Sequence, residues 1–207
     1  MKLIDGIKQT GKTVDILGTS RNDLPELFQQ LGYKRGAEIG VFKGTYTELF
    51  CKAGLFVFGI DPWLAYDEYA NQIGKNYQNQ QKQDYICHRA MKTLAPYKNI
   101  QIIKKTSMEA VKEFEDESLD FVYIDGHHGF KYVAEDIYEW SKKIRKGGAV
   151  CGHDYVLDDK LARSNYLDVV FVVDAYIRCF DIKTLYLLGN RDHITYGKLR
   201  NWMWFKE

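Results

Sequence analysis

Short apolar runs that alternate with amphipathic stretches constrain the fold of this sequence more than any other feature. Leu55–Asp61 and Leu119–Asp125 are nearly continuous in apolar residues, as expected for strands buried on both faces of a parallel sheet. Further strands are expected at Gly36–Val41, Ile100–Lys104 and Ala149–His153. Because helical stretches separate these strands, the pattern predicts a doubly wound α/β fold.

The stretches between the strands carry helix signals. Apolar residues recur at three- and four-residue steps from Phe130 to Ile144, and a Gly-Gly pair follows them. Thr45 and Glu48 have the spacing of a capping box after the first strand. In the final third, a helix over VVFVVDAYIRCF precedes two strands, KTLYLLGN and LRNWMWFKE, which we expect to close the sheet as an antiparallel pair.

Composition excludes several classes of protein. The 207 residues carry a net charge of +1, which gives no electrostatic reason to bind nucleic acid or an anionic membrane. No apolar run approaches the ~20 residues that span a bilayer, and the four cysteines show no Cys-x-x-Cys spacing. We therefore expect a cytoplasmic protein that binds neither nucleic acid nor membrane and whose copies could form a homo-oligomer. It would be one domain over 1–207, with a helical lead-in at 1–34 and a core at 35–207.

The stretch GIKQTGKT, Gly6–Thr13, matches the written pattern of a phosphate-binding P-loop. Such a loop needs a buried strand before it and a long helix after it, whose amides hold the phosphate. Here the preceding strand could be only MKLID, and the following TVDIL stops at Gly18 before a new helix start near Asp23. We expect a polar lead-in without nucleotide chemistry, and a nucleotide hydrolase stays an alternative.

A second glycine stretch, AEIGVFKGTYTELF, has the better context, with a strand before it and a helix after it. The spacing Glu38-x-Gly40-x-x-x-Gly44 lets the backbone turn tightly and a ligand approach closely. The second strand ends at Asp61, 21 residues beyond Gly40, where a carboxylate suits the two hydroxyls of a ribose. A dehydrogenase is the alternative enzyme class, although its loop normally has closer glycines.

Three motifs in this order resemble the class I S-adenosylmethionine-dependent methyltransferases. They are Glu38–Gly44, Gly59–Trp63 and LDFVYIDGHHGFKYVAEDIYEWSKKIRKGGAVCGHD, of which the last is similar to a branch acting on small molecules. The resemblance runs from about Arg35 to Phe205. It implies a Rossmann-like sheet of seven strands in the order 3-2-1-4-5-7-6, mostly parallel with a C-terminal antiparallel pair. It also implies S-adenosylmethionine as cofactor and methyl transfer to a small-molecule acceptor, through a hydroxyl group.

The resemblance assigns the cofactor to particular residues. Glu38 and the loop from Gly40 to Gly44 would face its methionine end, Asp61 would bind the ribose, and the residues after the third strand would flank the adenine. Phe42 stands where the family more often has glycine. The full implied set is Glu38, Gly40, Phe42, Gly44, Asp61, Pro62, Trp63, Thr106, Ser107, Met108, Asp125 and His127. Ser107 could also cap the helix that follows it.

Acidic and imidazole groups follow two of the expected strands. Asp125 and His128 follow the fourth strand, and His153 and Asp154 follow the fifth. Neighbouring strands lie about 5 Å apart, so these groups are expected to meet at the carboxyl edge of the sheet. We expect Asp125 and Asp154 to be functional, with His153 or His128 as the general base.

The same groups suit a divalent metal. Metal-dependent relatives such as catechol O-methyltransferase hold magnesium through an acid after the fourth strand and an Asp-Asn pair after the fifth. Asp125 matches the first, whereas His153-Asp154 replaces the pair, and magnesium at Asp125 and Asp154 is a second expectation. A cofactor-binding module without catalysis is the remaining alternative. The tyrosine-rich segments Tyr66–Tyr97 and Tyr155–Tyr166 are expected to border an aromatic or sugar-like acceptor.

Overall fold

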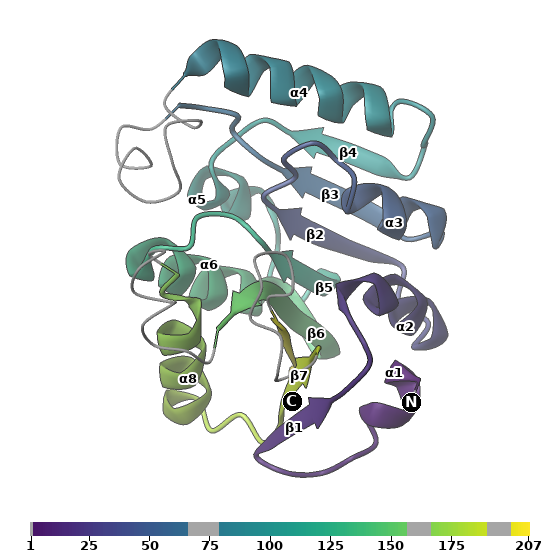
Figure 1. Ribbon diagram of the computed structural model, residues 1–207, viewed down its shortest axis with the longest axis vertical. Coiled ribbons are helices and arrows are strands. Elements are labelled where there is room, and N and C mark those ends of the chain that lie inside the picture. The colour runs from purple at the N-terminus through teal and green to yellow at the C-terminus, as the bar shows by residue number, and fades with distance from the viewer. Residues whose placement is uncertain (1, 66–78, 157–166, 190–199) are drawn as a thin grey trace.

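A single eight-stranded sheet forms the centre of the computed structural model, which describes residues 2–65, 79–156, 167–189 and 200–207 (Figure 1). The strands are β1 (Thr13–Ile16), β2 (Arg35–Ile39), β3 (Phe56–Ile60), β4 (Ile100–Ile103), β5 (Leu119–Ile124), β6 (Ile144–Tyr155), β7 (Leu185–Leu188) and β8 (Arg200–Phe205). The helices are α1 (Leu3–Gly6), α2 (Leu24–Gln30), α3 (Thr47–Lys52), α4 (Gln80–Leu94), α5 (Ser107–Ala110), α6 (Phe130–Lys143) and α8 (Val169–Cys179), with 3-10 turns η1 (Arg21–Asp23) and η3 (Val111–Glu113).

The strand order confirms the predicted arrangement and adds one strand to it. The sheet runs β1-β7-β8-β6-β5-β2-β3-β4, so that β2 to β8 follow the expected order 3-2-1-4-5-7-6. All neighbours are parallel except β8, which is antiparallel to both β6 and β7. The predicted closing pair of antiparallel strands is therefore present.

The eighth strand comes from the N-terminal segment, which was expected to be a helical lead-in. β1 pairs in parallel with β7, with Val14 opposite Tyr186 and Ile16 opposite Leu188. Val14 and Ile16 are buried while Thr13 is exposed, because alternate residues of a strand face opposite sides of a sheet. Residues 1–34 therefore supply an edge strand as well as helices α1 and α2.

The same segment contains the P-loop pattern, and its structure differs from that of a P-loop. Leu3–Gly6 is a short helix, and Thr13 begins β1, so no helix follows the glycines. A Cβ atom on Gly6 would lie 2.5 Å from Ile16, which explains the glycine by packing. The described backbone lacks the strand–loop–helix arrangement that phosphate binding requires.

Two helical layers cover the two faces of the sheet (Figure 1). Helices α1 to α4 bury apolar side chains such as Phe28 and Phe50 against one face. Helices α5, α6 and α8 cover the other face, where Val133, Ile137 and Trp140 form the predicted apolar stripe of α6. The sheet is thus buried on both sides, as its apolar strands predict.

One predicted helix start was wrong. α3 begins at Thr47, and neither Thr45 nor Glu48 forms a capping box. The backbone amide of Glu48 instead donates to the carbonyl of Gly44 at 2.9 Å, because the glycine loop continues directly into the helix. The Glu48 carboxylate accepts from Tyr97 at 2.8 Å and pairs with Lys52.

Several expectations concern residues outside the described part of the chain. The connection between β7 and β8, most of the loop Tyr155–Tyr166, and residues 66–78 of the tyrosine-rich segment belong to this group. Within the described residues, Gln80–Leu94 of that segment form α4. No helix found there has the length and apolarity needed to cross a membrane.

Candidate active site

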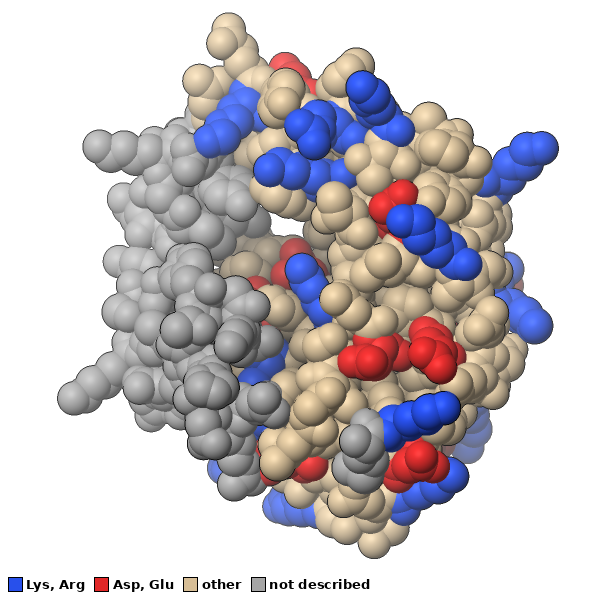
Figure 2. Space-filling view, turned by 45° about the vertical axis from the view of Figure 1, so that its right-hand side comes forward, with Lys and Arg blue, Asp and Glu red and all other residues tan. Residues whose placement is uncertain are grey.

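A pocket of about 500 Å³ opens at the carboxyl edge of β2, β3, β4 and β5. Its volume lies in the range of small-molecule sites. Ten of the twelve predicted cofactor residues line it, namely Gly40, Phe42, Asp61, Pro62, Trp63, Thr106, Ser107, Met108, Asp125 and His127. Figure 2 shows the hollowed face, where acidic and basic side chains are both spread over the surface and meet within the hollow.

Gly40 allows the chain at the end of β2 to lie very close to the ends of β3 and β5, beside the pocket. Its φ of 92° lies in the left-handed region, and its amide donates to the carbonyl of Ile60 at 2.9 Å. A Cβ atom at this position would stand 2.1 Å from the carbonyl oxygen of Asp125. Only glycine fits here, for both conformational and steric reasons.

Asp61 fastens the glycine loop to the turn after β3. Its Oδ2 accepts from the amide of Phe42 at 2.9 Å, and its Oδ1 accepts from the amide of Trp63 at 2.8 Å. The indole of Trp63 in turn donates to the carbonyl of Phe42 at 2.9 Å. Phe42 and Trp63 both have positive φ, at 53° and 44°, so these three bonds offset a backbone conformation that is costly for large residues.

Two predicted cofactor residues lie away from the pocket lining. Glu38 is fully buried beneath the loop, where burial raises its pKa to about 8. Its Oε2 has no hydrogen-bond partner among the described residues. Gly44 turns the chain into α3, with Leu94 3.0 Å from where a Cβ atom would lie. Gly44 therefore shapes the turn into α3, whereas Glu38 lies in β2 between β3 and β5.

A series of hydrogen bonds between side chains of α5 and α6 borders the pocket. Trp140 donates to the Ser107 hydroxyl at 2.7 Å, and that hydroxyl donates to the carboxylate of Asp136. Thr106, not Ser107, caps α5, through a capping box with Glu109. Burial raises the pKa of Asp136 to about 7. Sequence reasoning missed Asp136, although its place on the apolar stripe of α6 marks it as a buried acid.

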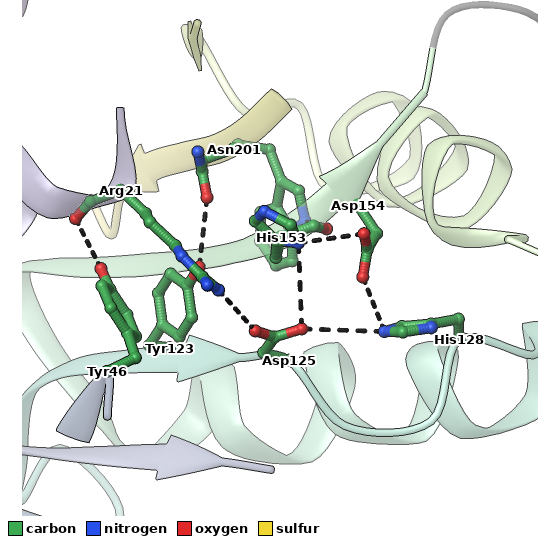
Figure 3. Close-up of polar contacts among 9 residues, drawn as sticks. Arg21, Tyr46, Tyr123, Asp125, His128, His153, Asp154 and Asn201 are labelled. Carbon is green, nitrogen blue, oxygen red and sulfur yellow. Dashed lines mark hydrogen bonds and ion pairs between the residues drawn. The ribbon is translucent and has the colours of Figure 1, made fainter. Parts of the chain in front are cut away.

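The predicted catalytic residues converge at the ends of β5 and β6 (Figure 3). His128 Nε2 lies 2.7 Å from Asp154 Oδ2 and 3.7 Å from Asp125 Oδ1. The shorter contact is an ion pair by distance, although the ring is not well aligned for a hydrogen bond. His153 Nδ1 lies 2.9 Å from Asp154 Oδ1 and 4.0 Å from Asp125 Oδ1. The two acids and two imidazoles therefore form one cluster.

The charges in this cluster strongly affect the protonation of His128 and Asp154. Burial alone would lower the pKa of His128, but the Asp154 and Asp125 carboxylates outweigh it and raise that pKa to about 10. Burial likewise opposes ionisation of Asp154, yet His128 and His153 hold its pKa well below its usual range. His128 is thus a cation at neutral pH, which disfavours it as the base. Of the two predicted bases, His128 lines the pocket, whereas His153 joins the cluster through Asp154.

Arg21 joins the cluster from the N-terminal segment, and sequence reasoning missed it. Its Nη1 lies 3.0 Å from Asp125 Oδ2, across 104 positions of sequence. Its guanidinium carbon stands 4.8 Å from the centre of the Tyr46 ring, and its carbonyl accepts from the Tyr46 hydroxyl at 2.6 Å. No local motif marks Arg21, because only the tertiary fold brings η1 to the end of β5.

The cluster also contains a set of possible metal ligands. Asp125, His128 and Asp154 each offer a ligand atom, all within 4.8 Å of one another, which is the right chemistry for several divalent ions. However, Asp125 Oδ2 already pairs with Arg21 at 3.0 Å, and Asp154 Oδ1 lies 2.9 Å from Nδ1 of His153, which is outside this donor set. As arranged, these residues do not fit a divalent ion, which would have to displace Arg21 from Asp125.

Sequence comparison gives one family match. Residues 37–155 match the family model described as a methyltransferase domain. The protein y4gI of Sinorhizobium fredii (strain NBRC 101917 / NGR234) is 29% identical over 135 residues, which are 62% of this chain and 14% of that protein. The chain therefore spans about a seventh of the length of this relative.

Structural similarity covers most of the chain. An O-methyltransferase from Bacillus cereus in complex with SAH (S-adenosylhomocysteine) has a TM-score of 0.63 at 16% identity, covering 90% of this chain and 80% of that one. The O-methyltransferase TomG from Streptomyces achromogenes, in complex with SAM (S-adenosylmethionine), has a TM-score of 0.65 at 14% identity, with 90% and 79% covered. An rRNA methylase from Streptococcus thermophilus has a TM-score of 0.57 at 12% identity, with 84% and 87% covered. At these identities the likeness shows the fold alone.

Proposed function

The chain belongs to the methyltransferase domain family, and from this premise we propose that it transfers the methyl group of S-adenosylmethionine to a hydroxyl group of a small molecule. The observation that carries the proposal is the adjacency of two sites. A pocket built around Gly40 and Asp61 reaches Asp125, where an acid and imidazole cluster begins.

The pocket residues fit the cofactor by their chemistry. Gly40 lets the loop turn directly against the backbone of Asp125. The Asp61 carboxylate can accept from the ribose hydroxyls through lone pairs that its backbone bonds leave over. His127 stacks on Tyr132 with ring centres 4.0 Å apart, beside Met108 in the same pocket, which offers flat and polarisable surface to the adenine. When bound, the cofactor supplies an electrophilic methyl group.

Methyl transfer is an in-line displacement, so the chain mainly has to align the two reactants and remove one proton. Asp154 holds Nδ1 of His153, which leaves Nε2 of that ring to accept the hydroxyl proton. Trp202 donates to the carbonyl of His153 at 3.0 Å and fixes the backbone on the other side. We assign His153 as the general base, oriented by Asp154.

Calorimetry tests the cofactor assignment first. We expect S-adenosylmethionine and its demethylated product to bind, whereas ATP and NAD should not, and Asp61→Ala should weaken binding. Lys12→Ala, in the P-loop pattern, should leave it unchanged. Binding of ATP alone would favour a nucleotide hydrolase, and binding of NAD alone a dehydrogenase.

A methyl-transfer assay over a panel of small hydroxyl compounds then tests the chemistry, with transfer of labelled methyl groups as the readout. His153→Ala should lower kcat by about 10²-fold or more while S-adenosylmethionine binds as before. His88→Ala, an exposed histidine of α4, is the matched control. Equal rates for the two variants would remove His153 as the base. Cofactor binding without transfer to any compound would instead support a cofactor-binding module.

The cellular setting is also part of the proposal. The net charge of +1 gives no reason for nucleic-acid binding, and the four cysteines form no disulfide. Free thiols suit a reducing compartment, which supports a cytoplasmic location. Cell fractionation and size-exclusion chromatography would test the location and a homo-oligomeric state.

A further inference from the structure

We propose that Arg21 is the resident cation of the acceptor site, so that methyl transfer proceeds without a divalent metal ion. This inference rests on the proposed function. Its first support is position, since the guanidinium lies 3.0 Å from Asp125, which lines the cofactor pocket. Asp125 also belongs to the group of three donors that could hold a metal ion.

The fold holds Arg21 in place from several sides. Ser20 caps η1 through a capping box with Asp23, and this box fixes the backbone on both sides of Arg21. The Tyr46 hydroxyl binds the carbonyl of Arg21, and the Tyr46 ring lies beneath the guanidinium. Tyr46 is itself buried between Phe50 and Tyr123, so that the arginine rests on the core. The ion pair is therefore a built feature of the site.

Arg21 also lies outside the residues that match the methyltransferase domain, which begin at residue 37. Arg21 lies in η1, in the same N-terminal segment as β1, which is the strand beyond the expected seven. The N-terminal segment of this chain therefore supplies the positive charge.

A guanidinium can do part of what a metal would do at this place. It carries five N–H donors, of which Nη1 bonds to Asp125, and 36% of its side chain is exposed. The exposed donors can bind the acceptor oxygen as negative charge develops on it. His153 takes the proton, the oxygen lone pair forms the new O–C bond, and the electrons of the C–S bond remain on sulfur. No further reactant is needed.

Arg21 and a divalent ion exclude each other at Asp125. An ion bound to this carboxylate would stand beside the guanidinium, and two like charges repel strongly where the surroundings are partly buried. Removing the positive charge of Arg21 should therefore let a divalent ion reach the carboxylates of Asp125 and Asp154, which belong to the donor group of this cluster.

The experiment combines metal binding with turnover. Calorimetric titration with MnCl₂ should show no binding to the wild-type protein, whereas Arg21→Gln should gain a site that Arg21→Gln/Asp125→Asn loses. After dialysis against EDTA, the wild type should keep its full methyl-transfer rate. Arg21→Gln without metal should lose about 10²-fold in kcat, the size expected for one stabilising donor. Arg21→Lys should recover part of this loss.

Arg89→Gln, an exposed arginine of α4, is the control and should match the wild type in every measurement. S-adenosylmethionine should bind Arg21→Gln as it binds the wild type, since Arg21 does not line the cofactor pocket, and this shows that the variant is folded. Manganese binding to the wild type as tight as to Arg21→Gln, or loss of wild-type turnover in EDTA, would overturn the inference. Failure of the wild type to bind S-adenosylmethionine would overturn the proposed function instead.

Discussion

Asp61 has two roles: it holds the glycine loop in place, and its carboxylate lines the pocket. Its oxygens already accept from the amides of Phe42 and Trp63. Burial nevertheless raises its pKa to about 6, since the backbone bonds only partly offset the loss of solvent. The ionised form of Asp61 is the better acceptor for ribose hydroxyls, so cofactor binding and ionisation are linked.

We predict that the affinity for S-adenosylmethionine rises as the pH increases through about 6. Below this pH the Asp61 carboxyl is protonated, and the cofactor must displace the proton. The dissociation constant should be roughly tenfold weaker at about pH 5 than at about pH 7.5. Calorimetry at both values checks this, with Asp61→Asn as the comparison, because an amide does not titrate. A wild-type dependence that persists unchanged in Asp61→Asn would assign the effect to another group.

Gly40 yields a second residue-level prediction. Gly40→Ala should destabilise the protein by roughly 3 kcal/mol or more and abolish cofactor binding, because the new Cβ would overlap the carbonyl of Asp125. Gly54→Ala is the control: its φ of 79° is also positive, but nothing lies within 4 Å of its Cβ position, so it should cost about 1–2 kcal/mol. Urea denaturation measures both. Equal losses would mean that backbone conformation alone explains Gly40.

At the scale of elements, the predictable parts are those with a long local pattern. The core strands and α6 follow from apolar runs and helical periodicity, whereas the strand order was implied only by the resemblance to the methyltransferases. β1 was missed because four residues at a sheet edge give little periodicity. Arg21 and Asp136 were missed as site residues because their roles depend on tertiary approach, from η1 and from the buried face of α6.

The edge strand β1 can be tested through one ion pair. Arg200 of β8 is 4% exposed and reaches Asp15 of β1, and it also donates to the carbonyl of Leu187 in β7, which lies between them. Asp15→Ala should cost about 3–5 kcal/mol in unfolding free energy, because it leaves a buried guanidinium without its carboxylate.

Two variants make that test specific. Asp5→Ala removes an exposed pair with Lys8 and should cost less than about 1 kcal/mol. Asp15→Ala/Arg200→Met should recover much of the loss, since it removes the unpaired charge. Cofactor affinity should stay unchanged in every case, because β1 is at the sheet edge away from the pocket. A loss no larger than that of Asp5→Ala would show that the pair does not hold β1.

The whole molecule concentrates buried ionisable groups at one edge of its sheet. Burial raises the pKa of Glu38 to about 8, of Asp136 to about 7 and of Asp61 to about 6, from ordinary values near 4. The pKa of His128 is raised to about 10 by two carboxylates, against the opposing effect of burial. In all four cases the folded chain binds its proton more tightly than the unfolded chain does.

The shared direction fixes how stability depends on pH. An acid with a raised pKa stabilises the folded state while its proton stays bound. This stabilisation is lost as the pH rises from the pKa of the acid in the unfolded chain to its pKa in the folded chain. For the three acids, this pH window runs from about 4 to about 8. His128 extends the same loss from 6.5 towards about 10. Asp154 acts oppositely, because its lowered pKa adds stability that is lost only on strong acidification.

We therefore predict that the unfolding free energy of the cofactor-free protein is higher at about pH 5 than at about pH 8, by a few kcal/mol. Urea denaturation across this range checks it. Glu38→Gln should flatten the slope, most clearly near pH 7 to 8, because the amide keeps the shape of the acid without its charge. Asp5→Asn, at an exposed site, should leave the slope as it is. A slope that Glu38→Gln does not change would mean that Glu38 stays ionised in the folded core.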